Sequence, residues 1–164
     1  MRQGLVVGLV LLLAGCGGPP PPDTGPPPMA PPPPPPNAAQ VAMASPQQDA
    51  AGKQFNPPPP GMAAVYFYTP TPVGPGIVVT ENLQRVGRLG PQTWMRIEVG
   101  AGQHMVRCMA LDATNELSLS LAPGDMRFVD IEMPPGQPVC TMRETGPGAG
   151  RSAVLQSGRA LQIQ

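Results

Sequence analysis

Hydrophobic and polar residues alternate in short runs through most of the second half of the chain. Residues 95–99 (Met-Arg-Ile-Glu-Val) and 117–121 (Leu-Ser-Leu-Ser-Leu) place apolar side chains on one face and polar side chains on the other. A period of two is typical of a half-buried β-strand. Such alternation, or a run of aromatic and β-branched residues, predicts strands at residues 65–69, 77–80, 85–89, 95–99, 104–110, 117–121, 126–133 and 139–143.

Turn residues separate these predicted strands at regular intervals. Pro75-Gly76, Gly100-Ala101-Gly102, Pro123-Gly124 and Pro134-Pro135-Gly136 each lie between two of them. Short strands with a turn roughly every 10 residues are typical of an antiparallel sandwich or barrel. We therefore predict an all-β domain over residues 61–145, a small antiparallel β-sandwich of about seven or eight strands. In the C-terminal tail, residues 146–164, we expect a weak helix from Arg151 to Leu161, with Gly158 unfavourable inside it.

The stretch before the predicted domain has no such alternation. Proline blocks occupy residues 19–22, 26–28, 31–36 and 57–60. Proline fixes φ and has no amide hydrogen, so these blocks favour polyproline II and cannot join a sheet. With few large apolar residues to bury, residues 16–60 are predicted to be a disordered tether that mainly sets the reach of the domain. A docking site for an aromatic-lined groove is the alternative, although Lys53 alone supplies a nearby positive charge.

The first residues of the chain form a separate pattern. Met1-Arg2 precede an uncharged run from Leu5 to Ala14. That run has the length of a signal-peptide hydrophobic region and is well short of the roughly 20 residues of a membrane-spanning helix. It ends in Leu13-Ala14-Gly15-Cys16, which resembles the lipobox of bacterial lipoproteins.

The lipobox resemblance implies a lipid anchor. Residues 1–15 would be a lipoprotein signal peptide, removed by a peptidase that cuts before Cys16, and acyl chains such as palmitate would be attached to this cysteine. Two or more acyl chains hold a protein stably on a membrane, whereas one holds it only marginally. Gly17 stands where an Asp would favour the inner membrane, so we expect the outer membrane, facing the periplasm. An ordinary secretory signal, or a short anchor helix with a chance cysteine, is the alternative.

Two further cysteines lie inside the predicted sandwich. Cys108 shares a strand face with Val106 and Ala110, and Cys140 shares one with Met142, so both are expected to face the core. In an oxidising compartment two such cysteines usually form a disulfide. We predict the Cys108–Cys140 bridge, and leave two buried free thiols as the alternative.

Charge and the remaining polar residues indicate little chemistry. Ten Lys and Arg balance ten Asp and Glu, and no basic patch indicates nucleic-acid binding. His104 has no metal-ligand spacing around it, and Ser118 and Ser120 lie in no nucleophile elbow. Asp130 and Glu132 share one strand face and are expected to be solvated rather than an acid–base pair. We therefore predict no catalytic residue, no metal and no cofactor.

The predicted domain is similar to PEGA-type β-sandwich modules of bacterial lipoproteins and to a related domain of unknown function. The resemblance rests on residues 65–68, on Val86-Gly87-Arg88-Leu89 and on residues 99–106, and it covers roughly residues 62–144. Gly100-Ala101-Gly102 stands in place of the usual proline-glycine turn. The group implies an envelope-facing binding or structural module and supplies no catalytic residues.

Two functional hypotheses follow. In the first, a membrane-anchored, non-enzymatic lipoprotein presents its β-module to an envelope protein or cell-wall partner. In the second, a periplasmic binding protein or enzyme contacts carbohydrate or peptidoglycan through exposed aromatic residues, with Tyr66, Tyr68 and Trp94 as candidates. Exposed aromatics around a concave polar pocket would favour the second hypothesis, and a featureless convex sandwich would favour the first.

Overall fold

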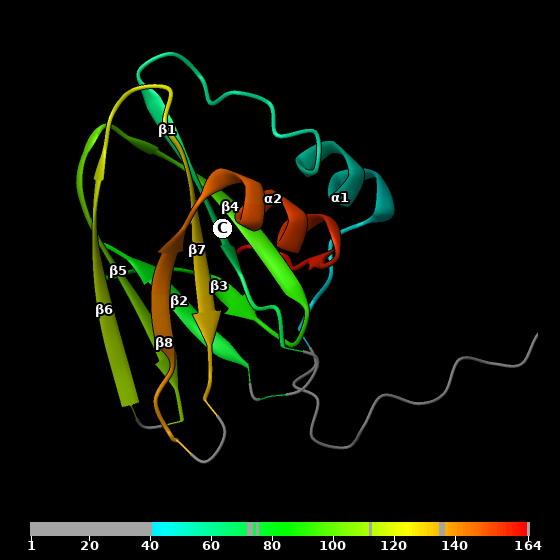
Figure 1. Ribbon diagram of the computed structural model, residues 1–164, viewed down its shortest axis with the longest axis vertical. Helices are drawn as coiled ribbons and strands as arrows, with labels where there is room; N and C mark the ends of the chain where they lie inside the picture. The colour runs from blue at the N-terminus through cyan, green and yellow to red at the C-terminus, as the bar shows by residue number, and fades with distance from the viewer. Residues whose placement is uncertain (1–40, 72–73, 75, 112, 135–136, 164) are drawn as a thin grey trace, which may run out of the picture. The chain divides into compact units, whose positions relative to one another are not determined.

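The computed structural model describes residues 41–71, 74, 76–111, 113–134 and 137–163 (Figure 1). The predicted signal peptide, Cys16 and the tether as far as residue 40 lie outside these ranges. The described residues form an all-β fold with two short helices. The elements are α1 (Pro46–Gly52), β1 (Met62–Tyr68), β2 (Ile77–Glu81), β3 (Gln84–Leu89), β4 (Thr93–Gly100), β5 (Gly102–Ala110), β6 (Ala113–Leu121), β7 (Met126–Glu132), β8 (Thr141–Thr145), α2 (Pro147–Leu155) and β9 (Gly158–Arg159).

The strands build two sheets, which confirms the predicted sandwich. The five-stranded sheet has the order β8-β7-β1-β4-β9 and the four-stranded sheet the order β3-β2-β5-β6. Each of the eight strands predicted from the sequence corresponds to an observed strand, from β1 to β8. Pairing is mostly antiparallel, but β1 pairs parallel with β7 and β4 pairs parallel with β9. The chain reverses direction three times between β4 and β7, through β5 and β6 of the other sheet, and β7 therefore runs antiparallel to β4 and parallel to β1.

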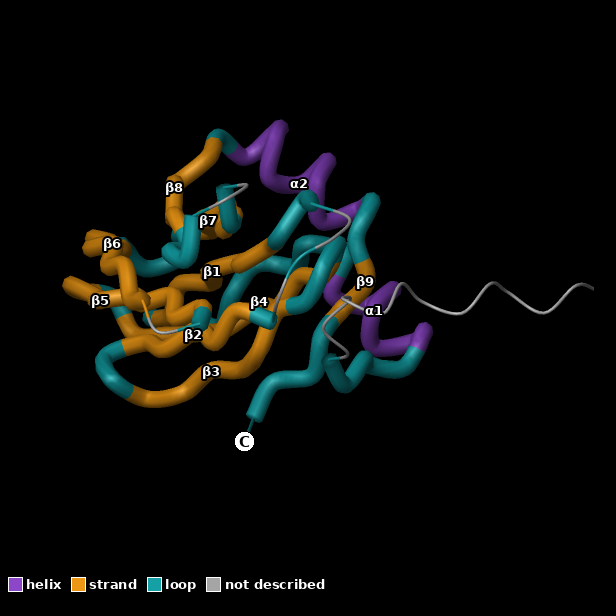
Figure 2. Tube along the Cα trace, turned by 90° about the horizontal axis from the view of Figure 1, so that it is seen from below, coloured by secondary structure: helices purple, strands orange, loops and turns teal. Residues whose placement is uncertain are grey.

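The core lies between the two sheets. Val65, Phe67 and Val129 of the five-stranded sheet face Val79 and Val106 of the four-stranded sheet, and all five are at most 1% exposed. The outer face of the five-stranded sheet is also covered, because α1 and α2 lie against it (Figures 1 and 2). The domain therefore has three layers: helices, the five-stranded sheet, and the four-stranded sheet.

Helix α1 corrects the predicted tether. Ser45 caps the helix in a capping box with Gln48, and Pro46 occupies its first turn. The Tyr66 hydroxyl donates to the Gly52 carbonyl at 3.2 Å, and Trp94 Nε1 donates to Asp49 Oδ1 at 2.9 Å. The prediction of a disordered tether over residues 16–60 is thus wrong for residues 41–60. Their order depends on partners in β1 and β4 that are distant along the chain.

The C-terminal tail also belongs to the domain. Its helix α2 spans Pro147–Leu155, so it begins four residues before the predicted start at Arg151 and ends before Gly158. Gly150 of α2 packs directly on Phe128. After β9, the Ala160 amide donates to the Trp94 carbonyl at 2.8 Å, and the Leu161 amide donates to the Ala42 carbonyl at 2.8 Å. Residues on both sides of the predicted 61–145 boundaries therefore pack into one unit with the sandwich.

Candidate functional site

The structure brings Cys108 and Cys140 together. Their sulfur atoms lie 2.10 Å apart, at disulfide distance, and their Cα atoms are 6.2 Å apart. Cys108 comes from β5 and Cys140 from the segment just before β8, so the pair joins the two sheets through the core. Both residues are fully buried, as the strand pattern predicted. The Asn115 side chain donates to the Cys140 carbonyl at 3.2 Å and holds this segment against β6.

The aromatic residues proposed as a carbohydrate-contacting surface are buried. Tyr66 and Trp94 have no exposed area and Tyr68 is 3% exposed, so the prediction of an exposed aromatic cluster is wrong. Strand β1 is buried on both faces, because the helices cover the side that faces away from the core. Tyr66 stacks on Phe128 with ring centroids 5.1 Å apart. Burial raises the pKa of the Tyr66 hydroxyl, and the nearby Arg96 guanidinium opposes this shift.

His104 holds the end of one strand in place. Its Nδ1 lies 2.7 Å from Glu81 Oε1, and its Nε2 lies 2.8 Å from the Gly100 carbonyl. These contacts join β5 to β2 and to the β4–β5 turn. Ser118 and Ser120 of β6 are exposed. His104 is the cross-strand partner of Leu119, which lies between the two serines and points to the opposite, buried face of the sheet. The structure therefore does not bring the histidine and these serines together.

Of the two acidic residues on β7 that were expected to be solvated, Asp130 is instead buried. Asp130 is 6% exposed, and it pairs with Arg143 of β8 at 2.7 Å between Oδ2 and Nη2. Strand β7 lies between β1 and β8, and their register places Tyr68 and Arg143 on either side of Asp130. The expectation that Asp130 is solvated is wrong because these two neighbours cover it.

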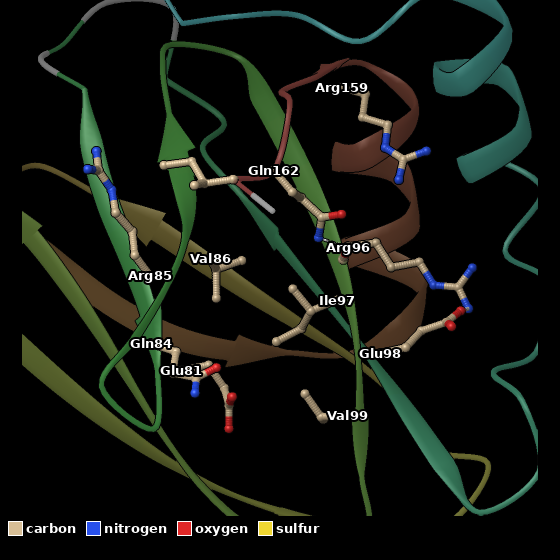
Figure 3. A pocket seen from close by; sticks show the side chains of 11 residues that line it. Glu81, Gln84, Arg85, Val86, Arg96, Ile97, Glu98, Val99, Arg159 and Gln162 are labelled. Atoms are coloured by element: carbon tan, nitrogen blue, oxygen red, sulfur yellow. Dashed lines mark hydrogen bonds and ion pairs between the residues drawn. The ribbon is translucent and has the colours of Figure 1, made fainter.

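A groove lies between the edge strand β3 of one sheet and strand β4 of the other. Eleven residues line it, and its volume is about 510 Å³. Val86, Ile97 and Val99 form its apolar floor and also pack against the core. Figure 3 shows Ile97 and Val99 pointing toward β3, whereas Arg96 and Glu98 project from the opposite side of β4. We call this feature the β3–β4 groove.

The C-terminal segment, residues 160–163, crosses one end of the β3–β4 groove. Gln162 forms an antiparallel bridge with Gly87 of β3, and the Ile163 amide donates to the Val86 carbonyl at 3.0 Å. On the other side, the Gln162 side-chain amide donates to the Arg96 carbonyl. An extended stretch of this chain thus already hydrogen-bonds to both walls. Neither the groove nor this segment was found from the sequence, because the segment shows no strand alternation of its own.

Charges at the β3–β4 groove do not all pair with one another. Arg96 pairs with Glu98 at 2.8 Å, and Glu81 pairs with His104 at 2.7 Å. Arg159 donates to the Gln48 carbonyl at 2.9 Å and lies over the Trp94 ring, 5.3 Å from its centroid. Within the described part of the chain, neither Arg159 nor Arg85 forms an ion pair. The lining therefore carries two guanidinium charges that no carboxylate of the described residues neutralises.

Among the described residues, no group of three or more His, Cys, Asp or Glu side chains is arranged to hold a metal ion. None of the helices in those ranges has the length and apolar character needed to cross a membrane.

Comparisons with known protein families, with characterised proteins and with solved structures find no match to this chain.

Proposed function

We propose that this protein is a lipid-anchored, non-enzymatic lipoprotein of the cell envelope that presents a β-sandwich interaction module. The anchor would be Cys16, and the expected partner is an envelope protein or a cell-wall component rather than nucleic acid. The proposal rests on the lipobox-like Leu13-Ala14-Gly15-Cys16 behind an uncharged run and a positive N-terminus. The resemblance to PEGA-type modules adds an envelope-facing role to the same proposal.

The cysteine pair is the structural observation that best supports an exported protein. Cys108 and Cys140 lie at disulfide distance in the core. Disulfides persist in oxidising compartments such as the periplasm and are rare in the cytosol. The predicted signal peptide and this cysteine pair both support export to an oxidising compartment.

Ordered residues 41–60 change the expected reach of the module. A tether that comprises residues 17–40 has 24 residues, whereas a tether over residues 17–60 would have 44. At about 3.1 Å per residue for an extended proline-rich chain, its greatest reach is roughly 75 Å instead of roughly 135 Å. The module would therefore contact partners nearer the membrane than the sequence alone indicates.

The test is lipid attachment at Cys16. Cells that express the full chain are grown with a radiolabelled fatty acid, and the purified protein is analysed for label and by mass spectrometry. The parent chain should carry label and lack residues 1–15, and Cys16→Ser should abolish both. Gly17→Ser is the matched control, because it changes the adjacent residue and leaves the cysteine. Label that still enters the Cys16→Ser protein would reject the anchor.

A further inference from the structure

The walls of the β3–β4 groove are strand edges, and among the described residues no strand pairs with most of their hydrogen-bonding positions. In the described residues, β4 pairs with β9 only at Thr93–Gly158 and Trp94–Arg159. Past Trp94, the edge of β4 is contacted by the C-terminal segment through the Gln162 side chain, which donates to the Arg96 carbonyl. Strand β3 is the last strand of its sheet. Unpaired N–H and C=O groups on an edge are a template for another extended chain.

The floor of the groove is apolar and continuous with the core. Val86, Ile97 and Val99 pack against the buried cluster but remain partly exposed at this opening. Side chains of an added strand point alternately to opposite faces, so every second residue would reach this floor. The C-terminal segment shows that an extended chain fits here, because residues 162 and 163 already bond to both walls.

We propose that the β3–β4 groove binds an extended, acidic peptide segment of a partner protein by adding it as a strand. The peptide would lie along the edge of β4 between Arg96 and Gly100, with β-branched side chains on the apolar floor and acidic side chains toward Arg85 and Arg159. Backbone hydrogen bonds give such complexes their affinity, and alternate side chains give them specificity. This inference rests on the proposed function in one respect: it takes the β-sandwich to be an interaction module and identifies the surface that would bind the partner.

Charge favours an acidic partner over a second copy of this chain. Arg85 and Arg159 line the groove without a carboxylate partner among the described residues, and Arg85 is exposed. A second copy docked groove to groove would bring the same guanidinium groups together, and like charges across an interface disfavour association. Acidic side chains would neutralise them.

Binding is tested by fluorescence anisotropy with the full-length protein in dodecyl maltoside. The probe is a fluorescein-labelled peptide of eight residues in which valine alternates with serine and glutamate. Its matched control has the same sequence with alternate backbone amides methylated. We expect saturable binding of the probe and binding of the methylated peptide at least about tenfold weaker, because N-methylation removes several backbone hydrogen bonds of about 1 kcal/mol each.

Two charge reversals on β3 provide the protein-side control. Arg85 lines the groove, whereas the Arg88 side chain lies over Gly76, outside the groove lining. Arg85→Glu should weaken binding about fivefold, and Arg88→Glu should leave it within about twofold, as expected for exposed charges. Both residues are exposed, so both variants should keep the parent melting temperature.

Several results would overturn the proposal. The first is the absence of saturable probe binding by protein that shows a normal thermal transition. The second is binding of the methylated peptide as tight as that of the probe. The third is an equal loss of probe affinity in Arg85→Glu and Arg88→Glu. A concentration-dependent dimer that excludes the probe would assign the groove to a second copy and reject the peptide partner. Absence of lipid at Cys16 would reject the anchor but would leave these binding measurements unchanged, so the two failures are distinguishable.

Discussion

Gly52→Ala tests whether residues 41–60 belong to the folded domain. Gly52 ends helix α1 over the ring of Trp94, and a Cβ at this position would lie 2.2 Å from Trp94 Cη2. Trp94 is fully buried in the five-stranded sheet, so its ring has little room to move. A disordered tether would tolerate the substitution without any effect on stability.

The expected loss follows from two opposing terms. Overpacking a well-packed site costs typically about 1–3 kcal/mol. Alanine is the better helix former by at most about 1 kcal/mol, and less at the last residue of a helix. We therefore expect a net destabilisation of about 1–2 kcal/mol. If α1 lifts instead, the bonds from Tyr66 and Trp94 to α1 are lost, at about 1 kcal/mol each, which gives a similar total.

The assay is thermal unfolding of the full-length protein, followed by circular dichroism and tryptophan emission. At roughly 4 °C per kcal/mol for a domain of this size, the melting temperature should fall by roughly 4–8 °C. Trp94 is the single tryptophan, so its emission reports directly on the covering by α1. Gly148→Ala is the matched control: a Cβ there meets nothing within 4 Å, and the change should be neutral or stabilising. An unchanged melting temperature and emission for Gly52→Ala would refute the packing of α1 on Trp94.

Two other predictions concern the core. The Cys108–Cys140 pair is separated by 32 residues, so its reduction should cost about 3.7 kcal/mol by the chain-entropy relation. At roughly 4 °C per kcal/mol, the melting temperature should fall by roughly 15 °C. Two titratable thiols in denatured, unreduced protein would contradict the bridge. Burial raises the pKa of both Tyr66 and Tyr68 in the folded state. The unfolded chain therefore loses these protons first, and stability should fall as the pH rises above about 10. Urea unfolding at a series of alkaline pH values measures this, and a Tyr66→Phe, Tyr68→Phe double variant should show a shallower fall than the parent.

The strands could be predicted from the sequence because their signal is local. An alternation of period two sets which side chains share a face, whatever the strand pairs with. Together with runs of aromatic and β-branched residues, this alternation was sufficient to locate all eight strands from β1 to β8 and to predict that Cys108 and Cys140 face the core. The alternation could not show that β1 is buried on both faces, since that depends on what covers the outer side of its sheet. Tyr66 and Trp94 were for this reason open to an interpretation as surface residues.

Only the tertiary structure decided the extent of the domain and the location of the β3–β4 groove. Ser45 and Gln48 form a capping box that the sequence displays, but seven helical residues between proline blocks are not stable alone. Helix α1 is ordered by the hydrogen bonds and packing of Tyr66 and Trp94, which are distant along the chain. Residues 160–163 likewise lie in the groove because β3 and β4 supply their partners. The sequence determines local periodicity and strand faces, whereas contacts between distant residues exist only once the two sheets have packed.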